Sequence, residues 1–237
     1  RWNDPAIIKD NNRAYNKIVY KTKGGVIVKD AEGNPVIAQT IPTTTRYTLP
    51  DKAIKVIYRS DSSGTSENFT NYLNKSAATV WTKAKNGTIA SGNPAGRMPV
   101  GSIGAANSQA LVSSVKATKY SIGYADLSDA VTSKVPFATI KNANGEWIAP
   151  TVTASAKFLE SFSGSSGFNA NTGAMTLNFT KKVAGGYNMS LVTYALVDKG
   201  SSSATAGQVE AFVKYMLNTC GPQKAASLGY APITGAL

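Results

Sequence analysis

The chain has 237 residues, of which 42% are hydrophobic and 16% charged, so it can bury the core of one large domain or two modest lobes. The 25 Lys and Arg residues outnumber 13 Asp and Glu residues, and the resulting net charge of +12 favours an anionic partner. Histidine is absent, which excludes Ser-His-Asp and Cys-His catalysis and histidine zinc sites. The cations are spread along the chain without a ladder of stacking aromatics, so we expect no nucleic-acid binding.

The N-terminal fifty residues are rich in loop-forming residues and predict one β-hairpin. Its strands are expected at residues 25–28 and 36–38, with a turn over residues 30–35. A short apolar strand is expected at residues 53–58, directly before a polar loop.

Further along the chain, predicted strands and helices alternate. Helices are expected after the polar loop, where Phe69, Tyr72 and Leu73 have helical spacing, and at residues 107–115, 127–131, 151–162 and 205–219. Strands are expected at residues 121–124 and 187–197, and a loop at residues 163–173. This alternation predicts an α/β fold with a largely parallel sheet.

The single cysteine, Cys220, cannot form an internal disulfide and does not indicate a redox compartment. It lies on an apolar stripe with helical spacing, and we expect Cys220 to be a small buried hydrophobe. The stripe consists of Val209, Phe212, Val213, Met216, Leu217 and Cys220. No apolar run approaches the length of about 18 residues typical of a membrane span, and no signal-peptide pattern is present.

The polar loop at residues 59–66 has the sequence RSDSSGTS and is the strongest candidate site. A loop that opens a helix presents backbone N–H groups without internal partners, at the positive end of the helix dipole, and can bind an anion there. Gly64 allows close approach of the backbone, Ser63 and Thr65 offer hydroxyls, and Arg59 offers a planar fork that Asp61 can orient. The same pattern also fits an ordinary strand-to-helix turn with capping Ser and Thr residues.

Residues 59–66, followed by Phe69-Thr70 and Tyr72-Leu73, resemble the signature of the phosphate-binding proteins of bacterial phosphate ABC transporters. Other landmarks of that family occur in the family's order. They are residues 2–7, Trp81, residues 121–124, residues 191–194 and residues 228–230. The resemblance therefore extends from residue 2 to about residue 233.

The resemblance implies a periplasmic-binding-protein-like fold of type II, with two α/β lobes that close over phosphate. Residues 1–186 would form most of the second lobe, with an inserted hairpin near residues 13–50, and residues 187–237 would return to the first lobe. Arg59 would form charge-assisted bonds to phosphate, Asp61 would hold Arg59, and Ser63, Gly64 and Thr65 would donate hydrogen bonds. Neither a metal nor another cofactor is implied.

The same resemblance implies capture of inorganic phosphate outside the cytoplasm and delivery to an ABC permease, by a secreted protein or a lipoprotein. In the family, most of the first lobe precedes residue 2, including an aspartate that accepts a hydrogen bond from protonated phosphate. We therefore expect a chain that is truncated, processed or split, with a separate chain or an N-terminal segment completing the first lobe. Residues 98–104 match the family's glycine-rich stretch only loosely, and no ligand contact is assigned there.

Two other functions stay open. An enzyme is disfavoured, because residues 64–68 lack the second glycine of a nucleophile elbow and no P-loop motif is present. The Ser-x-x-Lys spacing at Ser113 and Lys116 belongs to a plausible amphipathic helix. A phosphatase-like relative stays an alternative, and so does a surface scaffold that kept the fold and lost the ligand.

Overall fold

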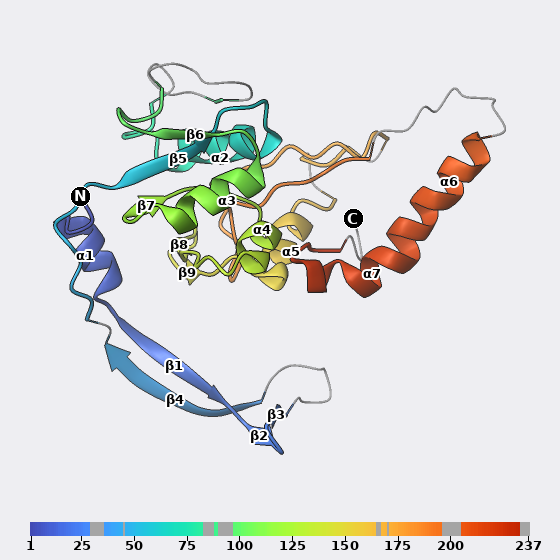
Figure 1. Ribbon diagram of the computed structural model, residues 1–237. Coiled ribbons are helices and arrows are strands. Elements are labelled where there is room, and N and C mark those ends of the chain that lie inside the picture. The colour runs from blue at the N-terminus through green and yellow to red at the C-terminus, as the bar shows by residue number, and fades with distance from the viewer. Residues whose placement is uncertain are drawn as a thin grey trace. The chain divides into compact units, whose positions relative to one another are not determined.

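The computed structural model describes residues 1–28, 36–44, 46–82, 88–89, 97–164, 167–169, 171–195 and 205–232 (Figure 1). The chain divides into two compact units, residues 1–54 and residues 55–237. Each unit is described by itself.

The N-terminal unit begins with helix α1 (Pro5–Asn11), followed by an antiparallel β-ribbon. The carboxylate of Asp4 caps α1 by accepting a hydrogen bond from the backbone N–H of Ala6 at 2.9 Å. Strands β1 (Ala14–Tyr20) and β4 (Ile37–Thr44) form the ribbon, with one register shift at Val19/Tyr20. Two short strands, β2 (Thr22–Lys23) and β3 (Val26–Ile27), pair with each other.

The pairing of these strands differs in part from the predicted hairpin, whose two segments are joined by one backbone hydrogen bond, from the N–H of Val36 to the carbonyl of Val28 at 2.9 Å. Strand β3 pairs with β2 across Gly24 and Gly25, and β4 pairs with β1. Both glycines have positive φ angles, 58° and 79°, which a two-residue hairpin turn requires. The short turn costs less loop-closure entropy than the predicted longer one. The predicted turn over residues 30–35 lies outside the described residues.

The second unit is built on a parallel three-stranded sheet in the order β6–β5–β7. Strands β5 (Lys55–Arg59), β6 (Ile103–Ala105) and β7 (Ser121–Ile122) are separated along the chain by helices α2 (Gly64–Ser76) and α3 (Ser108–Ala117), and α4 (Leu127–Thr132) follows. The predicted α/β fold with parallel strands is confirmed here. Strand β6 was not predicted, because three residues with glycine at the centre carry no strand pattern.

The first core of this unit lies between the sheet and α3. Ile57, Leu111, Val112 and Ala105 are its buried members. Gly123, directly after β7, allows α3 to approach the sheet closely. A Cβ at this position would lie 2.8 Å from Leu111 Cδ2 and 2.9 Å from Val115 Cγ2.

A second core gathers aromatic residues around helix α5 (Val152–Glu160). Phe158 and Phe162 meet edge to face with ring centroids 5.2 Å apart, and Phe179 meets Tyr72 of α2 in the same way at 5.9 Å. A small hairpin, β8 (Ile140–Lys141) and β9 (Trp147–Ile148), precedes α5 and was not predicted. Helix α5 itself confirms the helix expected at residues 151–162.

Residues 187–195 do not form the predicted strand. Tyr187, Asn188 and Ser190 are buried, as a core strand requires, but no ladder partner is described for them. Instead the backbone N–H of Tyr187 donates to the carbonyl of Ala154, and the amide of Asn188 donates to the carbonyls of Phe179 and Lys181. The polar groups of Tyr187 and Asn188 are thus hydrogen-bonded to helix α5 and to the backbone of residues 179–181, and not within a sheet.

The C-terminal helical region confirms the predicted helix but only in part the burial of Cys220. Helix α6 (Ala206–Tyr215) continues into a π-helical turn (Met216–Cys220), then α7 (Gly221–Lys224) and a short 3-10 turn (Ala226–Leu228). Along the predicted apolar stripe, Phe212 is 63% exposed, and Cys220 is only partly buried. The expectation of a buried Cys220 is therefore met only in part. Across the described ranges, the structure has no helix that is both long and apolar enough to cross a membrane.

The close approach at Gly123 generates a stability prediction. Gly123→Ala should lower the melting temperature by roughly 2–10 °C, because its Cβ overlaps Leu111 and Val115 and overpacking costs about 1–3 kcal/mol. Gly207→Ala is the matched control, since its Cβ would meet nothing within 4 Å and alanine favours the helix. Thermal unfolding followed by circular dichroism measures both; equal melting temperatures would contradict the packing described for Gly123.

Candidate functional site

The candidate site lies where the three parallel strands end. Arg59 is the last residue of β5, Ser108 follows β6 at the start of α3, and Tyr124 follows β7. Because the carboxyl ends of parallel strands share one edge of a sheet, these residues meet although up to 65 positions separate them.

The helix that follows Arg59 starts with open hydrogen-bond donors. Ser63 caps α2: its hydroxyl accepts from the backbone N–H of Ser66 at 3.1 Å, and its carbonyl accepts from that of Glu67. For the backbone N–H groups of Gly64 and Thr65, no acceptor is found among the described residues. These two donors lie at the positive end of the dipole of a helix of 13 residues.

The guanidinium of Arg59 is fixed on two sides. Its Nε and Nη2 donate to the two carboxylate oxygens of Asp61, each at 2.6 Å, and its Nη1 donates to the hydroxyl of Ser108 at 2.7 Å. The side chain of Arg59 is only 11% exposed. A guanidinium has five N–H groups, so two remain for a ligand, one on each terminal nitrogen.

The pairing shifts the pKa values of both partners. The hydrogen bonds from Arg59 lower the pKa of the Asp61 carboxyl, and the bond to Asp61 raises the pKa of Arg59. A second carboxyl, Asp126, has its pKa raised by burial and by Asp129, while Arg59 partly opposes the shift. Asp126 is therefore within electrostatic reach of the guanidinium.

Tyr124 joins the end of β5 to the first turn of α2. Its hydroxyl accepts from the backbone N–H of Arg59 at 3.1 Å and shares a 2.7 Å hydrogen bond with the hydroxyl of Ser66. Its ring stacks on Phe69 with centroids 4.5 Å apart. Pairing of β5 with β7 ends at Val56 and Ile122, so β7 offers no carbonyl to the backbone N–H of Arg59. The hydroxyl of Tyr124 accepts from this N–H in place of such a carbonyl.

The structure places the five predicted site residues on one strand end, loop and helix start. The expected pairing of Asp61 with Arg59 is present, and Ser63 and Gly64 stand at the start of α2. Among the described residues, no hydrogen bond is found for the hydroxyl of Thr65. Whether these residues contact a ligand stays a prediction.

Sequence reasoning missed the roles of Ser108 and Tyr124. Ser108 follows Asn107, which caps α3 by accepting from the backbone N–H of Ala110 at 2.8 Å, and that capping pattern marks a second helix start. Tyr124 belongs to a segment already singled out, but no local pattern indicates that its hydroxyl reaches Arg59.

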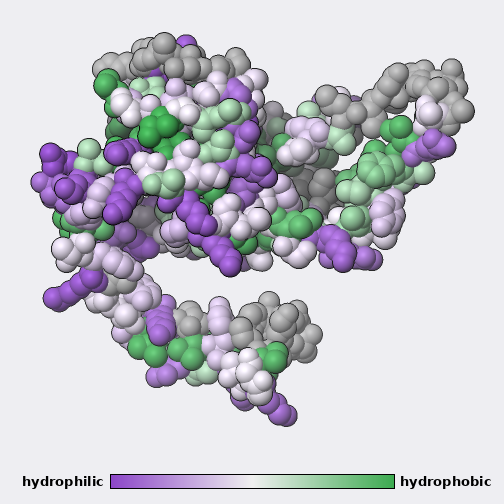
Figure 2. Space-filling view, viewed as in Figure 1, coloured by the Kyte–Doolittle hydropathy of each residue, from purple (hydrophilic) through white to green (hydrophobic). Residues whose placement is uncertain are grey.

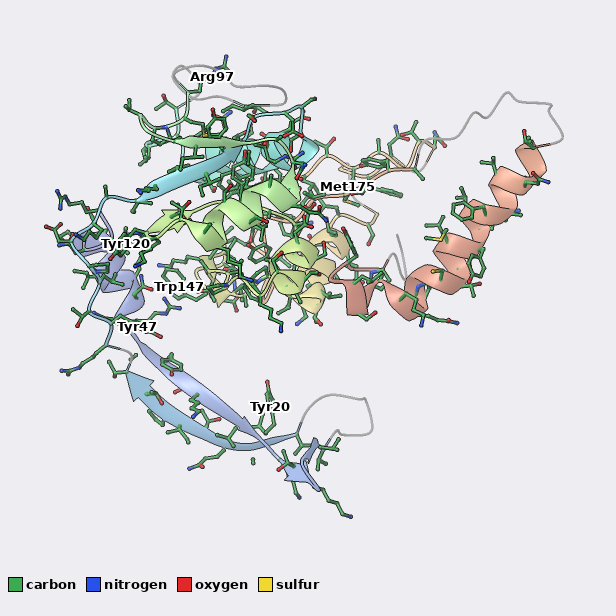
Figure 3. All side chains as sticks on the ribbon, in the orientation of Figure 1. Tyr20, Tyr47, Arg97, Tyr120, Trp147 and Met175 are labelled. Atoms are coloured by element: carbon green, nitrogen blue, oxygen red, sulfur yellow. The ribbon has the colours of Figure 1, made fainter. Side chains whose placement is uncertain are left out.

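A separate cavity of about 290 Å³ lies along α2, away from these contacts. It is lined in part by Asn68, Asn71, Met175 (Figure 3) and Tyr194. None of the five predicted site residues lines it, and none of its lining residues is charged.

The arrangement at the strand ends is chemically suited to bind an oxyanion. It combines backbone N–H groups, a fixed guanidinium and hydroxyls, all of them hydrogen-bond donors. In the part of the chain that the structure describes, no group of three or more Cys, Asp or Glu residues could hold a metal ion.

Comparison with known proteins agrees with this fold. A family model described as a PBP superfamily domain matches residues 28–219, more than half of the chain. The chain therefore belongs to the PBP superfamily. This membership confirms the predicted α/β fold of the periplasmic-binding-protein class.

Individual relatives share the name phosphate-binding protein PstS. The chain is 37% identical to the Xylella fastidiosa protein over 103 residues, which are 44% of this chain and 26% of the relative. It is 31% identical to that of Pasteurella multocida over 151 residues (64% of this chain, 32% of the relative), and 30% identical to that of Haemophilus influenzae over 192 residues (78% and 52%). The resemblance to phosphate-binding proteins is thus confirmed. The chain spans between about a quarter and a half of these relatives' lengths.

The role of Tyr124 generates a second prediction. Tyr124→Phe keeps the stack on Phe69 but leaves the N–H of Arg59 without its acceptor, which costs about 1–3 kcal/mol and should lower the melting temperature by roughly 2–10 °C. Tyr215→Phe, on the exposed part of α6, is the control and should change nothing. Thermal unfolding measures both variants. A melting temperature unchanged by Tyr124→Phe would show that the hydroxyl does not stabilise this strand end.

Proposed function

We propose that this chain binds inorganic phosphate at the ends of β5, β6 and β7, outside the cytoplasm, for delivery to an ABC permease. The observation that carries the proposal is the guanidinium of Arg59, fixed by Asp61 and Ser108 beside the open N–H groups of Gly64 and Thr65. The names of the relatives support phosphate as the ligand.

Phosphate suits these donors because its oxygens are tetrahedral and each accepts several hydrogen bonds. The two remaining guanidinium N–H groups can reach two oxygens, and the start of α2 can bind the others through its backbone. The hydroxyl of Ser63 accepts from Ser66 and keeps its own proton to donate. Selection of protonated phosphate over sulfate needs an acceptor as well, which we assign to a complementary segment of the first lobe.

Two surfaces of the second unit support such a complementary segment, either a separate chain or an N-terminal extension. The apolar stripe that runs from α6 into the following π-helical turn is exposed, with Phe212 at 63% and Leu217 at 49%. Residues 191–195 are not paired with a strand in the described structure. A partner that supplied a sheet edge and an apolar helix contact would cover both. On this proposal, residues 1–186 form most of one lobe and residues 187–237 return to the other.

Binding without turnover is favoured over catalysis. The hydroxyls of Ser63, Ser108 and Ser66 are held by a helix cap, by the guanidinium and by Tyr124, and none of these bonds is to a side-chain base. The phosphatase-like and scaffold alternatives are separated from the proposal by experiment.

Calorimetric titration with phosphate tests the site. Arg59→Ala should weaken binding about a hundredfold or more, because it removes charge-assisted bonds worth about 1.5–3 kcal/mol each. Asp61→Asn should weaken phosphate binding less, about tenfold, because it only loosens the position of the guanidinium. Arg46→Ala removes the same charge from the N-terminal unit and should leave the affinity unchanged.

The possible outcomes discriminate among the functions. Selective phosphate binding that Arg59→Ala destroys supports the proposal, with sulfate as the ligand control. Affinity unchanged in Arg59→Ala, or a larger loss in Asp61→Asn, would refute this site. Hydrolysis of a phosphomonoester that requires Arg59 would favour the phosphatase-like alternative, and absence of any phosphate binding would favour the scaffold.

A further inference from the structure

The β-ribbon of the N-terminal unit contributes no residue to the proposed phosphate site. It consists of β1 and β4, with β2 and β3 beyond one end (Figure 1). Strands β1, β2 and β3 precede the residues that match the family model, whereas β4 lies within them. The first strand of the ribbon and the β2–β3 turn therefore need an explanation of their own.

The ribbon exposes apolar residues and lacks a core. None of the described side chains in residues 1–54 is buried. Val26 is 70% exposed, Ile37 55% and Tyr20 41%, and Tyr20 lies directly opposite Ile37 in the register. In Figure 3 the Tyr20 side chain projects from the ribbon. A two-stranded ribbon is at best marginally stable alone in water, so a surface that covers these residues would stabilise it.

The charge of the ribbon restricts what can cover it. Six Lys and Arg residues and two acidic residues fall within positions 11–47, and both acidic residues lie in the stretch 29–35. Six cations less two carboxylates give positions 11–47 a net charge of +4. Five of the six cations lie in the described part of these positions: Arg13, Lys17, Lys21, Lys23 and Arg46. Figure 2 shows hydrophilic and hydrophobic residues side by side on the ribbon. A second copy of the same ribbon would repel it, whereas an anionic surface is complementary.

We propose that the ribbon binds the surface of an anionic lipid membrane, a function beyond phosphate capture. Lysine and arginine side chains attract phosphate headgroups, while their long apolar stems tolerate the interface. Tyrosine is enriched at this depth of a bilayer because its ring is apolar and its hydroxyl polar. The aliphatic side chains of Val26 and Ile37 can enter the acyl boundary. Nucleic acid would use the cations and tyrosines but not these aliphatic residues.

Vesicle flotation with the full chain tests the proposal in phosphate-free buffer. The chain should bind vesicles of phosphatidylcholine that contain phosphatidylglycerol, and bind phosphatidylcholine alone much less. The triple variant K17E/K21E/K23E should lose at least about a hundredfold in partitioning, since each cation near the surface contributes about fivefold and each substitution also adds a negative charge. Added salt should weaken wild-type binding by screening.

A matched control separates the ribbon from the overall positive charge. K119E/K141E/K182E reverses three exposed cations of the second unit and should keep most of the binding. A double variant that combines Val26→Ser and Ile37→Ser tests the apolar contact without a change in charge. It should reduce vesicle binding about tenfold or more.

Three results would overturn the inference: equal binding to both vesicle types, equal loss in the two triple variants, or capture of an acidic protein without vesicle binding. Phosphate titration of K17E/K21E/K23E should match the wild type. Failure of the membrane inference is therefore distinguishable from failure of phosphate binding.

Discussion

The bidentate pair of Arg59 with Asp61 is the interaction on which the candidate site depends. A guanidinium that is only 11% exposed would be costly without a partner, and the carboxylate of Asp61 satisfies two of its N–H groups. The pair carries no net charge, so it cannot bind an anion by charge alone. It offers donors in a fixed geometry, and the backbone N–H groups of Gly64 and Thr65 supply the rest of the attraction. Selection in such a site follows hydrogen-bond geometry, whereas the net charge of +12 acts at long range.

The position of that pair is set by the sheet. Strand β5 is central, with β6 and β7 on either side, and its Ile57 is completely buried against α3. The strand stays buried through Tyr58, and Tyr124 and Ser108 then hold Arg59 at its end: Tyr124 bonds the backbone N–H and Ser108 the guanidinium. A change in the packing of α3 would therefore shift Ser108, one of the two residues that orient the guanidinium.

Much of the site could be predicted from the sequence, because the residues of its central part lie close together along the chain. The strand, the loop and the cap at Ser63 lie within a few residues of one another, and capping and strand patterns indicate them directly. Ser108 and Tyr124 lie 49 and 65 positions from Arg59, and such contacts depend on sheet order, which local patterns do not encode. The wrong predictions have similar causes. Residues 187–195 have the burial expected of a strand, but the backbone N–H of Tyr187 bonds to helix α5 and not to a neighbouring strand. The apolar stripe that begins on α6 has a helical period, and that period does not indicate whether another surface covers it.

Phosphate capture and membrane attachment would place different demands on the two units. The site in the second unit needs a rigid, dry set of donors, and Arg59 and Ser63 are accordingly well shielded from solvent. The ribbon needs the opposite, since its cations and apolar side chains must remain accessible until they meet a surface. A receptor held at the membrane by such a ribbon would reach a permease at a high effective concentration, even if its contact with the permease were weak. Because the two demands lie in separate compact units, either surface could change without disturbing the packing that supports the other.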